Sequence, residues 1–206
     1  LPFSGFRFHC VSGVQSCARP IWVSVCGGPY FAFFLSVEKG EPTELIGVDL
    51  SRWKVAFNGS EPIRPETLEQ FSAKFAPWGF QSEAFLPCYG MAEATLFVSG
   101  GGRKGFHIVD TKTWAAQSGE RGFESGSIER IVASGKIWWD DIDVQIVDSD
   151  TLAGCPAGRI GEVWISVKSV TKGYWRAEKP VLQSLNGRDY LPTGDLGTIH
   201  NYELFI

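Results

Sequence analysis

The sequence has few of the residues that build metal sites or disulfide frameworks. Its three histidines, His9, His107 and His200, lie far apart, and its five cysteines form no CxxC pair. A structural zinc site needs cysteines and histidines at close, regular spacing, and a disulfide framework needs an even set of cysteines. Neither is predicted here, and scattered cysteines fit a reducing cytoplasm.

Positive charge in excess is also missing. The 206 residues include 19 Lys and Arg against 23 Asp and Glu, a net charge of -4. Proteins that bind nucleic acid or anionic membrane surfaces use a basic face. We therefore expect no nucleic-acid partner.

No apolar run is long and continuous enough to cross a membrane. The longest, Ile21–Val37, is interrupted at residues 27–29 and falls short of the roughly 20 residues of a spanning helix. It predicts a strand, a turn and then a helix. The chain starts at Leu1 with no charged segment before an apolar core, so we expect no signal peptide and interpret the sequence as a piece of a longer protein.

The region from residue 53 to residue 100 has the pattern of an α/β layer. Trp53–Phe57 favours a strand, followed by the turn residues "NGSEP". A helix is predicted from Pro65, with apolar residues at helical spacing, up to Pro77 and Gly79. A second strand, "EAFLPC", and a second helix beginning near Ala92 should follow.

This strand and helix order predicts a βαβ unit with parallel strands. The loops "NGSEP" and "YGMAE" would then open at the same carboxyl edge of the sheet, where α/β proteins bind ligands. Farther along, "IDVQIVD", "GEVWISV" and "ELFI" favour strands. The predicted division is 1–26 unassigned, 27–105 α/β, 106–130 an insertion or long connection, and 131–206 β-rich.

Four blocks of the chain together resemble a known superfamily. They are, in order, "WKVAFNGSEPIRPETLEQF", "CYGMAEATLFVSGG", "GEVWISVKSVTKGYW" and "YLPTGDLG". From about Gly27 to Ile206 the chain resembles the adenylate-forming enzymes, and within them the fatty acyl-AMP ligases. The resemblance implies the central part of their large N-terminal domain, a parallel α/β layer followed by a β-rich distorted barrel that ends before the hinge.

The activity implied by the resemblance is ATP-dependent activation of a fatty acid. Its carboxylate attacks the α-phosphate of ATP, pyrophosphate leaves, and the acyl group passes from the adenylate to an acyl carrier protein. ATP and Mg are the implied cofactors. An acyl-CoA synthetase is the alternative within the superfamily, and a non-catalytic remnant is the alternative outside it, because the upstream phosphate loop and the downstream lysine of the family are not in this sequence.

The resemblance also implies roles for individual residues. Tyr89 would stack on adenine, Asp195 would bind the ribose hydroxyls, and Glu93 would be the catalytic carboxylate that holds Mg. The other implied nucleotide-binding residues are Gly59, Ser60, Glu61, Pro62, Gly90, Met91 and Ala92. Ala92 stands where relatives have a phosphate-binding threonine, so one hydroxyl contact is missing.

Each of these residues also has an ordinary structural explanation. Tyr89 could pack against the core, Glu93 could favour a helix N-terminus, and Asp195 could be a turn residue. The segment "GGGRKG" lacks the ending of a phosphate-binding loop and predicts a connection. The segment "GGP" at 27–29 is interpreted either as the border of an acyl tunnel or as a helix entry.

Overall fold

The computed structural model describes residues 24–101, 104–111, 130–137, 141–176 and 181–206. Most of the unassigned segment 1–26 therefore lies outside the described residues. The chain divides into two compact units, Leu1–Pro87 with Arg103–His107 and Cys88–Gly102 with Ile108–Ile206.

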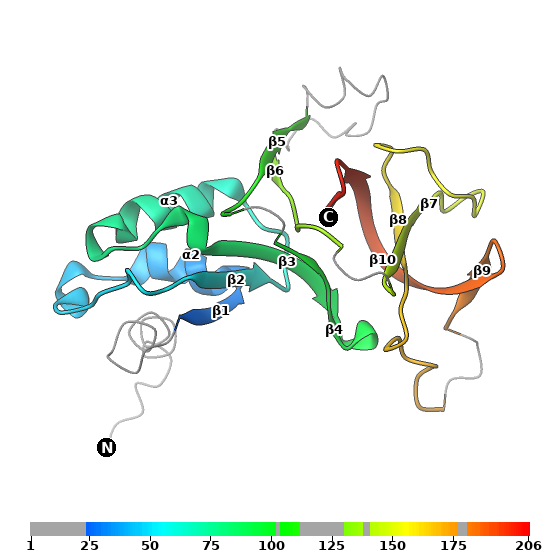
Figure 1. Cartoon of the computed structure of the whole chain (residues 1–206), viewed down its shortest axis with the longest axis horizontal. Coiled ribbons are helices and arrows are strands. Elements are labelled where there is room, and N and C mark those ends of the chain that lie inside the picture. The colour runs from blue at the N-terminus through cyan, green and yellow to red at the C-terminus, as the bar shows by residue number, and fades with distance from the viewer. Residues whose placement is uncertain (1–23, 102–103, 112–129, 138–140, 177–180) are drawn as a thin grey trace. The chain divides into compact units, whose positions relative to one another are not determined.

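The strands of the first unit form a parallel sheet, as predicted. They are β1 (Val25–Pro29), β2 (Val55–Gly59) and the beginning of β3 (Phe85–Met91). Both β1 and β3 pair with β2 in parallel (Figure 1). Strand β2 runs two residues beyond the predicted Phe57, so the turn after it begins at Ser60, whose φ is 69°.

The helices of this unit begin and end at sequence signals. Helix α2 (Tyr30–Lys39) follows β1 directly, with the extended Pro29 as its N-cap, so the structure has a helix entry at "GGP" and no separate turn. Helix α3 (Pro65–Phe75) starts at the predicted proline. The left-handed Gly79 then caps the 3-10 helix η2 (Ala76–Trp78). The other 3-10 helices here are η1 (Pro42–Leu45) and η3 (Ser82–Ala84).

Aromatic rings form much of the core of the first unit. Phe85 of β3 lies 5.3 Å from Phe33 of α2 and 5.6 Å from Phe71 of α3, measured between ring centroids. Since both helices contact one side chain, they cover the same face of the sheet. Phe57 of β2 pairs with the residue after Phe85, so it points to the opposite face, and it is 41% exposed.

The second unit begins with a hairpin where we predicted a helix. Beyond Pro87, β3 pairs antiparallel with β4 (Leu96–Gly100), and only the 3-10 helix η4 (Ala92–Ala94) lies between them. The prediction of a helix from Ala92 was therefore wrong. β-branched and aromatic residues in "TLFVSGG" favour an extended strand, and β3 supplies the partner that local sequence does not show.

The rest of the second unit is an antiparallel β structure, which confirms the β-rich prediction. The main sheet has the order β11-β10-β8-β7, and β9 also pairs with β10. These strands are β7 (Asp143–Val147), β8 (Gly161–Ser166), β9 (Gln183–Leu185), β10 (Arg188–His200) and β11 (Glu203–Phe205).

The predicted long connection is only partly described. Strand β5 (Ile108–Asp110) pairs antiparallel with β6 (Arg130–Val132), so the two ends of the segment lie side by side. Residues 112–129 between them are outside the described residues.

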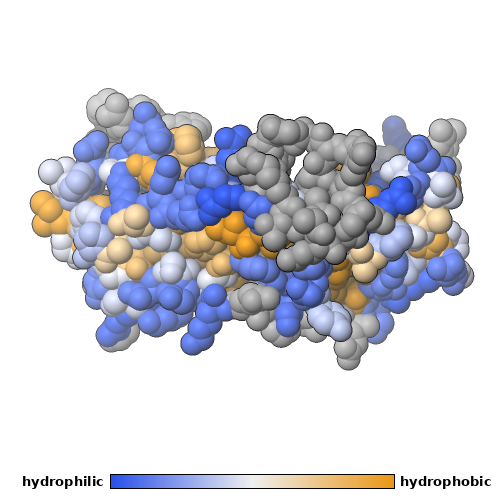
Figure 2. All heavy atoms as spheres, turned by 90° about the horizontal axis from the view of Figure 1, so that it is seen from above, coloured by the Kyte–Doolittle hydropathy of each residue, from blue (hydrophilic) through white to orange (hydrophobic). Residues whose placement is uncertain are grey.

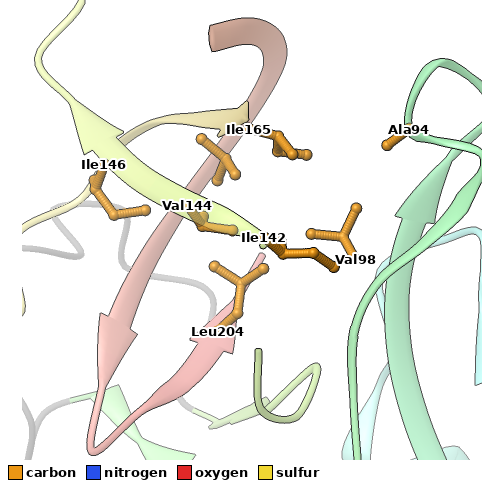
Figure 3. Close-up of a cluster of buried hydrophobic side chains, with 8 residues drawn as sticks. Ala94, Val98, Ile142, Val144, Ile146, Ile165 and Leu204 are labelled. Atoms are coloured by element: carbon orange, nitrogen blue, oxygen red, sulfur yellow. The ribbon is translucent and has the colours of Figure 1, made fainter. Parts of the chain in front are cut away.

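A buried aliphatic cluster joins the hairpin of the second unit to its main sheet. Val98 of β4 packs with Val144 of β7, Ile165 of β8 and Leu204 of β11 (Figure 3). Each of these side chains is at most 7% exposed. The hairpin is thereby held in place by burial of apolar surface.

The described residues on one face of the molecule are of mixed hydropathy (Figure 2). Figure 2 shows mostly hydrophilic residues on the visible face, with apolar residues between them. Within the part of the chain that the structure describes, no helix has the length and apolar character needed to cross a membrane.

Candidate functional site

Two predicted nucleotide-binding residues meet in the second unit. The hydroxyl of Tyr89, near the end of β3, donates a hydrogen bond to Asp195 Oδ2 on β10 at 2.6 Å. The two residues are 106 positions apart in the sequence. Burial, and next the hydrogen bond to Asp195, raise the pKa of Tyr89 well above its usual value, so the hydroxyl keeps its proton at neutral pH and acts as the donor.

Tyr89 also has the packing role that was its alternative explanation. Its ring lies against the aliphatic cluster of the second unit and is half-buried. Part of the residue remains accessible beside this packing. Packing and ligand contact are therefore compatible at this position.

Asp195 lies on a strand irregularity and not in a free turn. The segment "TGD" is inside β10, and the pairing of β10 with β8 shifts between Pro192 and Leu196. Gly194 has a φ of 78°, which a glycine adopts without strain. The free turn that was the alternative explanation for Asp195 is therefore replaced by a bulge-like irregularity within β10, because β8 pairs with β10 on both sides of it.

Side chains from β8 and β10 fix the shape of this bulge. The hydroxyl of Thr193 donates to the Val163 carbonyl at 2.8 Å and accepts from the Asp195 N–H at 3.1 Å. The Gly194 N–H donates to Glu162 Oε1 at 3.0 Å. The backbone around Asp195 is thus held at successive residues.

Glu162 was not among the residues predicted for the site from the sequence. Its other oxygen accepts a hydrogen bond of 2.9 Å from the indole N–H of Trp164, so one carboxylate links the strand β8 to the bulge. The signal was present in the block "GEVWISV", which places an acid one strand away from "TGD". Only the antiparallel register shows that the two meet.

Strands β3 and β4 approach each other closely at Gly90 because this residue has no side chain. A Cβ at Gly90 would overlap the carbonyl oxygen of Leu96 in β4. The backbone of Gly90 therefore lies very close to the backbone of the neighbouring strand β4. The next residue, Met91, packs against the aliphatic cluster, and Ala92 is exposed.

Glu93 lies in the single turn η4. Its carbonyl accepts a hydrogen bond from the Thr171 N–H at 2.7 Å, and its Oε1 accepts one from the Tyr174 hydroxyl at 2.8 Å. A backbone hydrogen bond within Glu93, and after it the bond from Tyr174, lower the pKa of this carboxyl. Glu93 is therefore a carboxylate at neutral pH, but no regular helix begins here to direct a row of N–H groups at a phosphate.

The other predicted nucleotide-binding loop belongs to the first unit. Gly59 ends β2, and Ser60, Glu61 and Pro62 follow it. Ser60 has a positive φ, which is uncommon for a residue with a side chain. Such backbone geometry is often kept at ligand sites. The structure brings Tyr89 and Asp195 together in the second unit, whereas this loop is a separate element of the first.

Comparison with known proteins identifies the family. Residues 9–175 match the family of AMP-binding enzymes. The medium-chain-fatty-acid–[acyl-carrier-protein] ligase JamA of Moorena producens is 32% identical over 227 residues, covering 99% of this chain and 38% of that protein. The ligase of the same description from Teredinibacter turnerae, TtuA, is 35% identical over 208 residues, covering 89% of this chain and 31% of that protein.

A solved structure shows the same fold. The fatty acyl-adenylate ligase from L. pneumophila, in complex with acyl adenylate and pyrophosphate, matches with a TM-score of 0.82 and 33% identity. The match covers 98% of this chain and 37% of the other. The chain thus spans between 31% and 38% of the length of these proteins. It belongs to the AMP-binding enzyme family, with fatty acyl-adenylate ligases among its relatives in sequence and structure.

Proposed function

We propose that the protein containing this chain activates a fatty acid with ATP and transfers the acyl group to an acyl carrier protein. The observation that carries the proposal is the hydrogen bond of 2.6 Å between Tyr89 and Asp195. It joins two of the motifs on which the resemblance rests, at the two residues expected to bind adenine and ribose. Packing alone does not require a carboxylate at this position.

The nucleotide would contact both parts of this pair. The ring of Tyr89 offers an apolar wall for adenine, and the Asp195 carboxylate offers acceptors for vicinal hydroxyls. Because the Tyr89 hydroxyl occupies Asp195 Oδ2, the carboxylate is oriented before the nucleotide arrives. For the loop Gly59–Pro62 of the first unit, the nucleotide-binding role is proposed from the resemblance alone.

Glu93 has the properties of a ligand for the magnesium of MgATP. It is an ionised carboxylate on a short turn, and Mg²⁺ is commonly bound by one or two carboxylates together with substrate phosphates. When bound, the metal would neutralise charge on the phosphates during attack by the fatty acid.

The acyl substrate and acceptor are the finer parts of the proposal. They are supported by the descriptions of JamA and TtuA as medium-chain-fatty-acid–[acyl-carrier-protein] ligases. A cytoplasmic location is proposed from the scattered spacing of the five cysteines in the sequence.

The test uses the full-length protein that contains this chain. Exchange of labelled pyrophosphate into ATP should depend on a fatty acid, and Glu93→Gln should reduce it strongly. Acyl transfer should be faster to a carrier protein than to coenzyme A. The absence of exchange with fatty acids of every chain length would refute the activation step, and efficient transfer to coenzyme A would identify an acyl-CoA synthetase.

A further inference from the structure

The segment 169–174, which follows β8, is bonded along the turn that carries Glu93. The hydroxyl of Ser169 donates to the Ala94 carbonyl at 3.0 Å, and the hydroxyl of Thr95 donates back to the Ser169 carbonyl at 3.0 Å. The Thr171 N–H donates to the Glu93 carbonyl at 2.7 Å. The backbone of the turn is therefore held from outside by this segment, which we call the clamp.

The turn needs such support because its backbone is unusual. Thr95 and Leu96 are consecutive residues with positive φ values, 58° and 82°. A β-branched residue in this conformation is an outlier that persists when surrounding contacts hold it. The bond from the Thr95 hydroxyl to Ser169 and the bond from the Ser169 hydroxyl to Ala94 provide such contacts.

The clamp also reaches the side chain of Glu93. Tyr174 lies at the end of the clamp, and its hydroxyl donates to Glu93 Oε1 at 2.8 Å. Thr171 bonds to Gly173 on the way, donating from its hydroxyl to the Gly173 carbonyl at 2.9 Å and accepting from the Gly173 N–H at 3.2 Å. The segment between Thr171, which bonds to the Glu93 backbone, and Tyr174, which bonds to the Glu93 side chain, is therefore itself held by hydrogen bonds.

Tyr174 is an exposed residue. Its side chain is 57% exposed, so hydrophobic packing does not explain its position. A hydroxyl that occupies one carboxylate oxygen restricts rotation of the carboxylate and leaves the second oxygen for another partner. Such a group orients a metal ligand without touching the metal.

We propose that Tyr174 is a positioning residue that orients the Glu93 carboxylate toward the divalent cation of a bound nucleotide. This inference rests on the proposed function, in which Glu93 binds that cation. It assigns a role to the block "GYW", which the resemblance used only as a landmark.

The experiment measures metal and nucleotide binding instead of turnover. The full-length protein is titrated calorimetrically with α,β-methylene-ATP, once with EDTA and once with saturating Mg²⁺. The ratio of the two affinities is the coupling between metal and nucleotide. Tyr174→Phe should reduce this ratio by about tenfold, the low end for loss of a partner behind a metal ligand, and leave affinity in EDTA unchanged.

Two further variants make the result specific. Tyr202→Phe removes the hydroxyl of an exposed tyrosine in the turn between β10 and β11, and it should behave as the unaltered protein. Glu93→Gln should remove most of the coupling. If Glu93→Gln has no effect, the metal role in the proposed function is wrong and the inference fails with it.

The inference can also fail by itself. It is overturned if Glu93→Gln removes the coupling and Tyr174→Phe retains it. It is equally overturned if Tyr174→Phe weakens nucleotide binding in EDTA and in Mg²⁺ by the same factor, which is the result of a purely structural role. Because phenylalanine keeps the ring at an exposed position, the melting temperature of this variant should match that of the unaltered protein.

Discussion

Replacing Tyr89 with phenylalanine should weaken ATP binding while keeping the ring that we propose as the contact for adenine. The change removes only the hydroxyl, which donates to Asp195 Oδ2 at 2.6 Å. Asp195 then loses the partner that orients its carboxylate. The carboxylate must be ordered when ribose binds, which lowers the affinity for ATP.

The expected loss follows from the type of bond. A hydrogen bond to a charged group contributes about 1.5–3 kcal/mol net. Because Tyr89 is only half-buried, water can replace part of the lost contact, and the lower end applies. A loss of about 1.5 kcal/mol corresponds to a roughly tenfold higher Kd for ATP, which is the effect we expect.

A second substitution separates the hydroxyl from the ring. Tyr89→Leu removes both, and stacking of a base on an aromatic side chain contributes about 1–3 kcal/mol. Affinity for ATP should therefore fall in the order Tyr, Phe, Leu. The measurement is calorimetric titration of ATP into the full-length protein.

The chain contains a matched control. The hydroxyl of Tyr190 also donates to a carboxylate at 2.6 Å, that of Asp143, and Tyr190 is buried. Tyr190→Phe should lower the melting temperature and leave the Kd for ATP unchanged. An unaltered Kd in Tyr89→Phe, or an equal rise in both variants, would refute the role of the pair between Tyr89 and Asp195.

Further predictions concern the bulge, the hairpin and alkaline stability. Glu162→Ala removes the acceptor of the Gly194 N–H, so calorimetry should show ATP binding weaker by about 1.5 kcal/mol. The ATP affinity of Glu162→Gln should lie between that of the unaltered protein and that of Glu162→Ala. Gly90→Ala forces a Cβ against β4 and should lower the free energy of unfolding by about 3 kcal/mol in denaturant titrations. Burial, followed by a hydrogen bond to a carboxylate, raises the pKa of Tyr190 from 10.0 to about 12. The stabilisation of the folded state by the protonated Tyr190 is therefore fully present below pH 10.0 and is lost as the pH rises toward about 12. Tyr190→Phe should remove this part of the pH dependence of the unfolding midpoint.

Local sequence signals predicted the elements whose limits are set by a few neighbouring residues. Helix α3 begins at Pro65 and is followed by the cap at Gly79, because proline fixes the first helical φ and glycine adopts a left-handed one. Strands β7 and β8 follow from alternating or β-branched residues.

The segment after Glu93 shows where local signals end. Its residues are compatible with both a helix and a strand, and pairing with β3 decides between them. The same applies to "TGD", which is a turn in isolation and a bulge when β8 pairs on both sides.

The sequence by itself determined the family, the main elements and the order of the motifs, because these depend on residue types at fixed spacing along the chain. The tertiary structure alone decided that Tyr89 bonds to Asp195, that Glu162 holds the bulge, and that Tyr174 reaches Glu93. Such contacts join segments far apart in the chain, so they depend on how strands and turns meet in three dimensions, which the residue types within one short segment do not specify.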